Sequence, residues 1–329
     1  MYRLAAATIG LTATVGIAEY VSRPSSINVF EELKSNISAF FSHSEELGED
    51  HRWSHVERLS ITAKAKTLVS KNVDIENHDN AISRRNEIMK YGYPTLDNIR
   101  IFDDFILAYS NVHKGPLWVC EHLTDYNVNI NNKEVNRSQS KFVPDNSVNP
   151  IFRGNNSDFL GSGFDRGHLA AAANHRQSQI AMNQTFFLSN ICPQIGKGLN
   201  RSKWNELEKR ARALSRKYGS SYVLTGPLYL PTVVGSEKFV KYKLIGDNNV
   251  AVPTHFFKVI VAQTKNGGFI LESYVMPNEE IRDDIPISSY LVPKHSVEKG
   301  AGFLIFDYIA DSQYCLINGQ SNPDFLKPN

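Results

Sequence analysis

Six strand-like segments constrain the fold of this chain more than any other feature of its sequence. Each is rich in β-branched and aromatic residues and is bounded by Gly, Pro or Asn. They span residues 99–110, 115–123, 221–230, 239–246, 254–262 and 268–276. The first two read as a hairpin closed by a turn at residues 111–115. Because no helical segments alternate with these strands, the sequence predicts an α+β fold with a mainly antiparallel sheet flanked by helices.

One helix stands out between the strands, at residues 202–218. Its apolar side chains recur at steps of three and four residues and form one stripe. The stripe consists of Trp204, Leu207, Ala211, Leu214 and Tyr218. Ser202 is predicted as its N-cap and Gly219 as the residue that ends it.

The first twenty residues have the composition of a targeting segment. They contain one Arg, several hydroxyl residues and no acidic residue before Glu19. The apolar run at 4–18 is shorter than the roughly 20 residues that a spanning helix needs. A mitochondrial presequence or weak inner-membrane anchor is expected here, with a secretory signal cleaved after Ala18 as the alternative and an ordinary N-terminal helix as the third.

The remaining chain divides by composition. Residues 21–90 read as a polar tether with room for one or two helical turns, residues 91–310 as the ordered domain, and residues 311–329 as a tail without a structural interpretation. The three cysteines, Cys120, Cys192 and Cys315, are odd in number and lack C-x-x-C spacing, so we expect free thiols rather than a disulfide scaffold. A net charge of +2 gives no global sign of a nucleic-acid partner.

Positive charge is nevertheless concentrated around the predicted helix. Residues 197–217 hold eight basic side chains against Glu206 and Glu208. A solvated helix face explains such a cluster in most proteins. Here it follows the loop I-G-K-G-L-N at 195–200, which could present charge to a phosphate backbone.

The run S-G-F-D-R-G-H-L-A-A-A-A-N-H-R at 162–176 has the residues for phosphoryl chemistry. A neutral histidine can accept a proton, and an arginine can stabilise charge that develops on a phosphoryl group. In an extended segment, Arg166 and His168 share one face, and Gly167 leaves room for a phosphate. The alternatives are that Asp165 pairs with a surface arginine and that His168 is an ordinary core histidine.

Further motifs decide between these possibilities. The runs at 165–176, 181–194 and 199–208, with L-T-G-P-L-Y-L at 224–230 and N-V-A-V-P-T-H-F-F-K-V at 249–259, closely resemble the DNA/RNA non-specific endonuclease family and its mitochondrial members. The resemblance covers about residues 91–306. It implies a ββα-metal fold, in which a strand that ends in the catalytic histidine is joined to a helix that supplies the metal-binding asparagine.

The same resemblance implies roles for individual residues. His168 matches the general base, Arg166 the arginine beside it, Asn200 the direct Mg²⁺ ligand, Asn190 a residue that holds the site, and Glu208 a carboxylate acting on the water shell of the metal. Arg153 matches an upstream phosphate-binding arginine. Further substrate contacts are expected from Asp165, His175, Lys197 and Arg201, with orientation as the other role for His175. A zinc site from His168, His175 and Cys192 is a weaker alternative, because its spacing fits none of the usual patterns.

The implied activity is Mg²⁺-dependent cleavage of DNA and RNA, with Mn²⁺ as a substitute and 5′-phosphate products. Mg²⁺ keeps several waters, so one asparagine is an adequate protein ligand, and phosphate contacts carry no base information. The need for neutral imidazole predicts activity that rises through the mid-6 pH range. The resemblance also implies a homodimer in the mitochondrial intermembrane space, with release to the nucleus and DNA fragmentation in cell death. A secreted scavenging nuclease and an inactive nucleic-acid-binding relative are the alternatives.

Overall fold

The computed structural model describes residues 75–130 and 132–326. The expected targeting segment at 1–20 and most of the expected tether lie outside the described residues. In the described part of the chain, no helix is long and apolar enough to cross a membrane.

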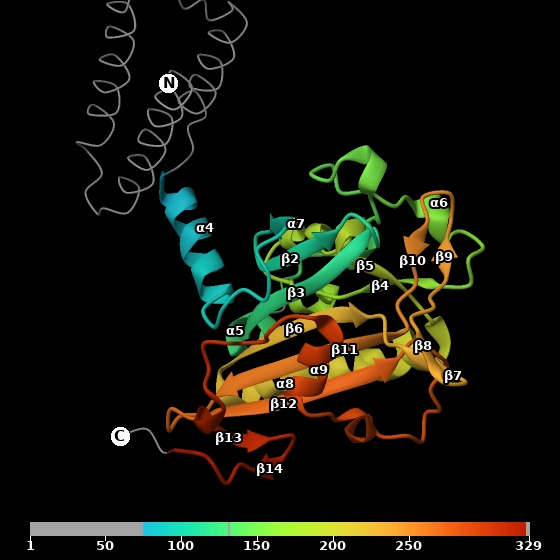
Figure 1. The fold of residues 1–329 in the computed structure, drawn as a ribbon. Coiled ribbons are helices and arrows are strands. Elements are labelled where there is room, and N and C mark those ends of the chain that lie inside the picture. Colours follow the sequence, from blue (N-terminus) through green and yellow to red (C-terminus); the bar gives the residue numbers. More distant parts are fainter. Residues whose placement is uncertain (1–74, 131, 327–329) are drawn as a thin grey trace, which may run out of the picture. The chain divides into compact units, whose positions relative to one another are not determined.

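An eight-stranded sheet forms the centre of the folded unit (Figure 1). All neighbouring strands are antiparallel except β12 and β13, which are parallel. In spatial order the strands are β1 (Ile99–Ile101), β2 (Phe105–Ser110), β3 (Gly115–Thr124), β6 (Ser220–Leu228), β11 (His255–Gln263), β12 (Phe269–Pro277), β13 (Tyr314–Ile317) and β14 (Gln320–Ser321). The predicted α+β class and mainly antiparallel sheet are confirmed.

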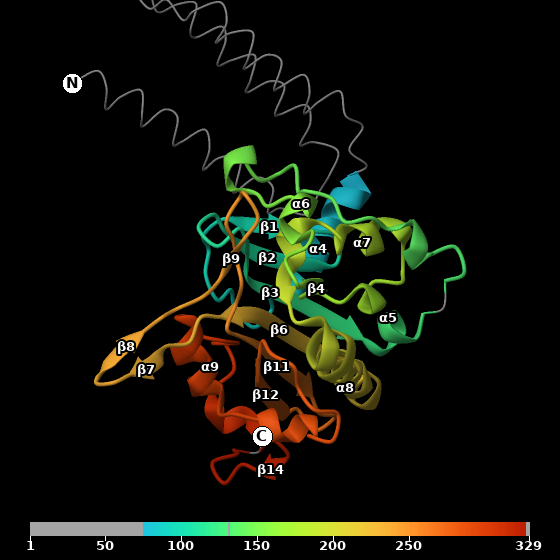
Figure 2. The same cartoon turned by 90° about the vertical axis from the view of Figure 1, so that its right-hand side faces the viewer.

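Both faces of this sheet are covered, which explains why its strands are continuous apolar runs. Successive residues of β2 alternate between two cores, with Phe105 and Leu107 in one and Ile106 and Ala108 in the other. Helix α8 (Trp204–Tyr218) covers the first face, while the end of α4 (Ile75–Ile88) and helix α9 (Lys294–Ala301) cover the second (Figures 1 and 2).

Shorter elements complete the folded unit. They are α5 (Asp125–Asn129), α6 (Asn156–Phe159), β4 (Asp165–His168), α7 (Gln179–Gln184), β5 (Ile191–Gln194), β7 (Thr232–Val234), β8 (Glu237–Phe239), β9 (Leu244–Ile245) and β10 (Val250–Ala251). The connections between β3 and β6 contain the residues of the candidate site.

The start of helix α8 differs from the prediction. Ser202 does not cap it, because its hydroxyl donates to Asp283 Oδ1 at 2.7 Å. The helix instead continues from a wide turn, Gly196–Lys203, in which Gly198 adopts a φ of 77°. The predicted end at Gly219 is confirmed, with a φ of 87° that favours glycine.

Two predicted strands also differ. Residues 99–110 form two strands rather than one, since a turn in which Phe102 N donates to Phe105 O reverses the chain. Residues 239–246 are mostly not a strand: Phe239 ends β8, and Leu244 begins β9. The exposed apolar side chains of this segment have no neighbouring strand of the main sheet to pack against.

The folded unit extends beyond both expected domain boundaries. Within the described residues it includes α4, from Ile75, and the strands β13 and β14, which lie outside the expected range of 91–310. Ile88 at the end of α4 is buried in the core, and Tyr314 in the expected tail is fully buried against Phe269, with ring centroids 6.4 Å apart. The residues expected to form a tail therefore complete the sheet.

Candidate active site

The D-R-G-H motif forms β4, which pairs antiparallel with β5. Gly167 faces Cys192 across the hairpin, and a Cβ added to Gly167 would overlap the buried side chain of Gln194. The glycine thus leaves room for the Gln194 side chain, which takes the space expected for a phosphate. The predicted extended conformation is confirmed.

Arg166 and His168 lie on the same face of β4, as the alternation predicts. Both contact Phe142, with the Arg166 guanidinium 4.4 Å and the His168 ring 5.2 Å from the centre of the Phe142 ring. Arg166 Nη1 also donates to Asn156 Oδ1 at 2.7 Å. Sequence reasoning missed Phe142, because nothing in its local pattern relates it to the motif.

The imidazole of His168 is almost fully buried. The ring of Phe186 packs edge-on against it at 4.6 Å, and its Nε2 has no hydrogen-bond partner among the described residues. Burial lowers the pKa of His168 to about 3, with smaller contributions from the charges of Arg137 and His175. The ring is therefore neutral far below the expected mid-6 range, and it retains a nitrogen that can accept a proton.

Asn190 fixes the backbone just after His168. Its side-chain oxygen accepts from Ala170 N at 2.9 Å, and its amide donates to the carbonyls of Ala170 and Thr185 at 3.0 and 2.8 Å. All polar atoms of this buried side chain are thus directed at backbone. Asn190 thus ties the backbone at Ala170 to that at Thr185, and its role in catalysis stays a prediction.

Asn200 lies in the turn before α8 and is oriented by Asp165. Its Nδ2 donates to Asp165 Oδ2 at 2.9 Å, while Arg201 donates to both oxygens of the same carboxylate at 2.8 and 2.6 Å. The hydrogen bonds from Arg201 are the main cause that lowers the pKa of Asp165. Asp165 therefore pairs with a surface arginine, as one alternative had it, and also holds Asn200.

These residues open into a cavity of about 430 Å³. Its lining is Phe142, Asn156, Phe159, Leu160, Gly161, Phe164, Asp165, Arg166, Asn200 and Arg201. Arg166, the expected phosphate-stabilising arginine, and Asn200, the expected metal ligand, thus line the same cavity. His168 is not part of the lining, but its ring contacts Phe142, which is.

Three other expected site residues lie outside this lining. Glu208 is half-buried on α8, where burial raises the pKa of its carboxyl and the charges of Lys258 and Arg212 oppose the rise. Arg153 donates to Asn146 Oδ1 at 2.6 Å, and the exposed Lys197 pairs with Glu280 at 2.5 Å. None of the three lines the cavity, so the water-shell role of Glu208 and the substrate contacts of Arg153 and Lys197 stay predictions.

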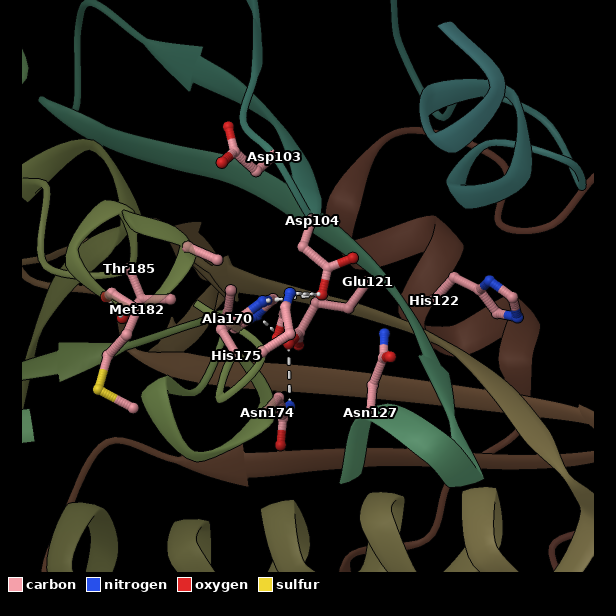
Figure 3. Close-up of polar contacts among 12 residues, drawn as sticks. Asp103, Asp104, Glu121, His122, Asn127, Ala170, Asn174, His175, Met182 and Thr185 are labelled. Carbon is pink, nitrogen blue, oxygen red and sulfur yellow. Dashed lines mark hydrogen bonds and ion pairs between the residues drawn. The ribbon is translucent and has the colours of Figure 1, made fainter. Parts of the chain in front are cut away.

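His175 lies in the core, with no exposed surface. Its Nε2 is 3.0 Å from Glu121 Oε1 and its Nδ1 is 3.3 Å from Asp104 Oδ2 (Figure 3). Burial alone would lower its pKa, but the hydrogen bonds and charges of the two carboxylates outweigh burial and raise the pKa to about 9. This placement contradicts substrate contact by His175 and leaves the orienting role.

The zinc alternative has no support in this geometry. Both nitrogens of His175 face carboxylates, and in the part of the chain that the structure describes no three His, Cys, Asp or Glu side chains are placed to hold a metal ion. Cys120, Cys192 and Cys315 are free thiols, as predicted.

Comparison with known proteins agrees with the motifs and the hairpin geometry. Residues 84–312 match the model of the DNA/RNA non-specific endonuclease family. The chain belongs to this family. It is 51% identical over 245 residues to a Caenorhabditis elegans protein named endonuclease G, mitochondrial, which covers 74% of this chain and 79% of that protein. The human protein of the same name is 46% identical over 219 residues, or 66% of this chain and 72% of the relative.

A solved structure shows the same fold. The crystal structure of a complex of EndoG with EndoGI, described as showing the mechanism of EndoG inhibition, superposes with a TM-score of 0.71 at 49% identity, over 72% of this chain and 97% of that one. The predicted family is confirmed, and the chain is a non-specific endonuclease.

The family implies a divalent metal, and the residues of the cavity fit one. Asp165 engages only the amide nitrogen of Asn200, and no donor in residues 75–130 or 132–326 reaches the Asn200 side-chain oxygen. A neutral oxygen at a water-accessible cavity suits a hard cation that keeps most of its waters, such as Mg²⁺.

Proposed function

We propose that this endonuclease is Mg²⁺-dependent, with Mn²⁺ as a substitute, and that it hydrolyses DNA and RNA to 5′-phosphate and 3′-hydroxyl ends. The observation that carries the proposal is the shared face of Arg166 and His168 on β4, beside the cavity that contains Asn200. These three residues provide a cation for phosphate, a neutral base and an oxygen ligand for a metal.

Substrate binding through the backbone follows from the chemistry of the cavity. Arg166 is exposed at its wall and held by Asn156, so its guanidinium is placed for phosphate oxygens. Phosphate contacts position a nucleic acid without reading its bases. Cleavage of both DNA and RNA without sequence preference is the expected result.

The proposed reaction is in-line hydrolysis of the phosphodiester. The neutral imidazole of His168 accepts a proton from the attacking water, an oxygen–phosphorus bond forms, and the bond to the 3′ oxygen breaks, with the leaving oxygen taking a proton from solvent. Arg166 stabilises the negative charge that develops on the phosphoryl oxygens. Asn200 would hold the metal, which when bound supplies Lewis-acid stabilisation of that charge. Asn190 keeps the backbone after His168 in place throughout.

We further propose that the protein is a homodimer of the mitochondrial intermembrane space that fragments DNA after release to the nucleus in cell death. The composition of residues 1–20 and the mitochondrial names of the C. elegans and human relatives support the mitochondrial location. The dimer and the role in cell death are carried over from the family resemblance. Protease protection in fractionated mitochondria tests the location, and light scattering tests the dimer. Recovery in the secreted fraction instead would support the scavenging alternative.

Cleavage of supercoiled plasmid and of RNA tests the chemistry directly. Wild-type protein with Mg²⁺, wild-type protein with EDTA, His168→Ala and Asn200→Ala are compared. We expect cutting only in the first sample, DNA binding retained by His168→Ala, and products that re-ligate without prior phosphorylation. Cutting by His168→Ala at the wild-type rate would exclude His168 as the base, and cutting in EDTA would exclude the metal requirement.

A further inference from the structure

Residues 169–190 leave the β4–β5 hairpin directly after His168 and return to it at Ile191. We refer to them as the 169–190 excursion. Its near end is closed by Asn190, and it carries Phe186, whose ring lies edge-on against the His168 imidazole. The position of the His168 ring thus depends on where the excursion is held.

The excursion is anchored in the core by a cluster of buried polar side chains. His175 bridges Glu121 on β3 and Asp104 in the turn before β2, at 3.0 and 3.3 Å (Figure 3). Asn174 Nδ2 donates to the same Glu121 oxygen at 2.9 Å. His175 and Glu121 are fully buried, and Asn174 and Asp104 nearly so.

A second layer of contacts ties this cluster to two helices. Arg84 of α4 donates through Nε to Asp104 Oδ1 at 2.6 Å and through Nη2 to the His122 carbonyl at 2.8 Å. Arg212 of α8 donates to Asn174 Oδ1 at 2.9 Å. The anchor therefore joins α4, the sheet and α8 at the point where the excursion meets them.

Such a cluster is not explained by stability alone. Replacing buried ion pairs with apolar side chains is often neutral or stabilising, because desolvation offsets much of the Coulomb attraction. What the buried contacts of His175 with Glu121 and Asp104 supply is a defined geometry. No residue of this cluster lines the active-site cavity, so direct contact with substrate does not account for it either.

We propose that His175 is a positioning residue for the endonuclease reaction: its contacts with Asp104 and Glu121 fix the 169–190 excursion and, through Phe186, the ring of His168. The proposal rests on the proposed function, in which His168 is the base. Arg84 extends the same role to helix α4, because it holds Asp104.

The test compares His175→Gln with wild type in the full-length chain. Glutamine can still donate to Glu121 but loses the charge and the second nitrogen. A misplaced base slows the chemical step, so we expect kcat to fall about 10- to 100-fold, with KM changed less than about twofold. The imidazole ¹⁵N resonances of His168, assigned by comparison with His168→Gln, should shift as the packing of Phe186 changes.

Arg210→Met is the matched control. Arg210 lies on α8 away from the cluster, and the substitution removes its partly buried ion pair with Glu272 of β12. It should lower the melting temperature yet leave kcat and the His168 resonances unchanged. Equal losses of kcat in the control and in His175→Gln would show that the fall in kcat comes from lower stability, and they would overturn the proposal. So would a folded His175→Gln protein with wild-type kcat.

Arg84→Gln provides a second variant if His175→Gln does not fold. Arg84 is partly exposed, so its loss should loosen Asp104 with a smaller fall in kcat and the same direction of shift in the His168 resonances. An unchanged kcat and unmoved resonances in Arg84→Gln would remove α4 from the proposal. Failure of the proposed function and failure of the positioning role can be told apart. An active His168→Ala protein overturns the proposed function. An inactive His168→Ala protein together with a fully active His175→Gln protein overturns only the positioning role.

Discussion

The carboxylate of Asp165 accepts a hydrogen bond from the side-chain amide of Asn200 at 2.9 Å. This bond fixes which end of the amide faces the cavity, and it leaves the oxygen of Asn200 for a cation. Asp165 is the first residue of the D-R-G-H motif, so the motif that contains the base also orients the expected metal ligand, and Asp165 lines the same cavity as Arg166 and Asn200.

Asp165→Ala should therefore weaken metal binding while leaving His168 in place. Loss of a partner that orients a metal ligand typically costs tenfold or more in affinity, so the Mg²⁺ concentration for half-maximal activity should rise about tenfold. A Mg²⁺ titration of plasmid cleavage measures it. Arg201→Met is the control, since it removes the ion pair but leaves the Asn200 bond. An unchanged titration for Asp165→Ala would show that Asn200 is oriented by other means.

The depressed pKa of His168 predicts an unusual pH profile. The base must be neutral, and burial keeps it neutral down to its pKa of about 3. The rate of the chemical step should thus stay level as pH falls from 8 to 5, without the decrease near 6.5 that an exposed histidine would cause. Single-turnover cleavage across this range tests it, with His168 ring resonances as an independent titration. A clear midpoint near 6.5 in both measurements would mean that the ring is solvated in solution.

The sequence was sufficient for the parts of the fold that depend on local pattern. Strands buried on both faces are continuous apolar runs, and β6, β11 and β12 were each bounded by Gly, Pro or Asn, so all three were predicted. The segment at 239–246 carried a similar local pattern but lacks a neighbouring strand in the main sheet. Strand formation there depended on a partner that periodicity cannot reveal.

The candidate site divides in the same way. His168, Arg166 and Asn200 could be proposed from the sequence because they belong to motifs that carry the family resemblance. The partners of His175 were not found, because Glu121 is 54 residues away in the sequence and no spacing rule links the two. Phe142 was missed for the same reason. Buried charge pairs and packing contacts of this kind are set by the tertiary fold.

The raised pKa of His175 predicts that the free energy of unfolding decreases at alkaline pH. Protonated His175 is bound between two carboxylates in the folded state, so folding raises its pKa from about 6.5 to about 9. Its contribution is fully present below the unfolded value and is lost as pH rises through 9. Urea unfolding at pH 6, 8 and 9.5 should show a larger decrease for wild type than for His175→Gln. Parallel decreases in the two proteins would show that His175 is not the group responsible.

The close approach of the two strands at Gly167 gives a packing prediction. A Cβ at this position would overlap the Gln194 side chain, which is fully buried in the folded protein. Gly167→Ala should therefore destabilise the fold by about 1–3 kcal/mol, as overpacking of a filled interior does, and it should lower activity because the displaced strand ends in His168. Gly115→Ala is the control, since a Cβ there meets its nearest neighbour at an ordinary 3.6 Å. Thermal unfolding and plasmid cleavage of both variants test the prediction, and equal behaviour of the two would show that Gln194 yields without cost.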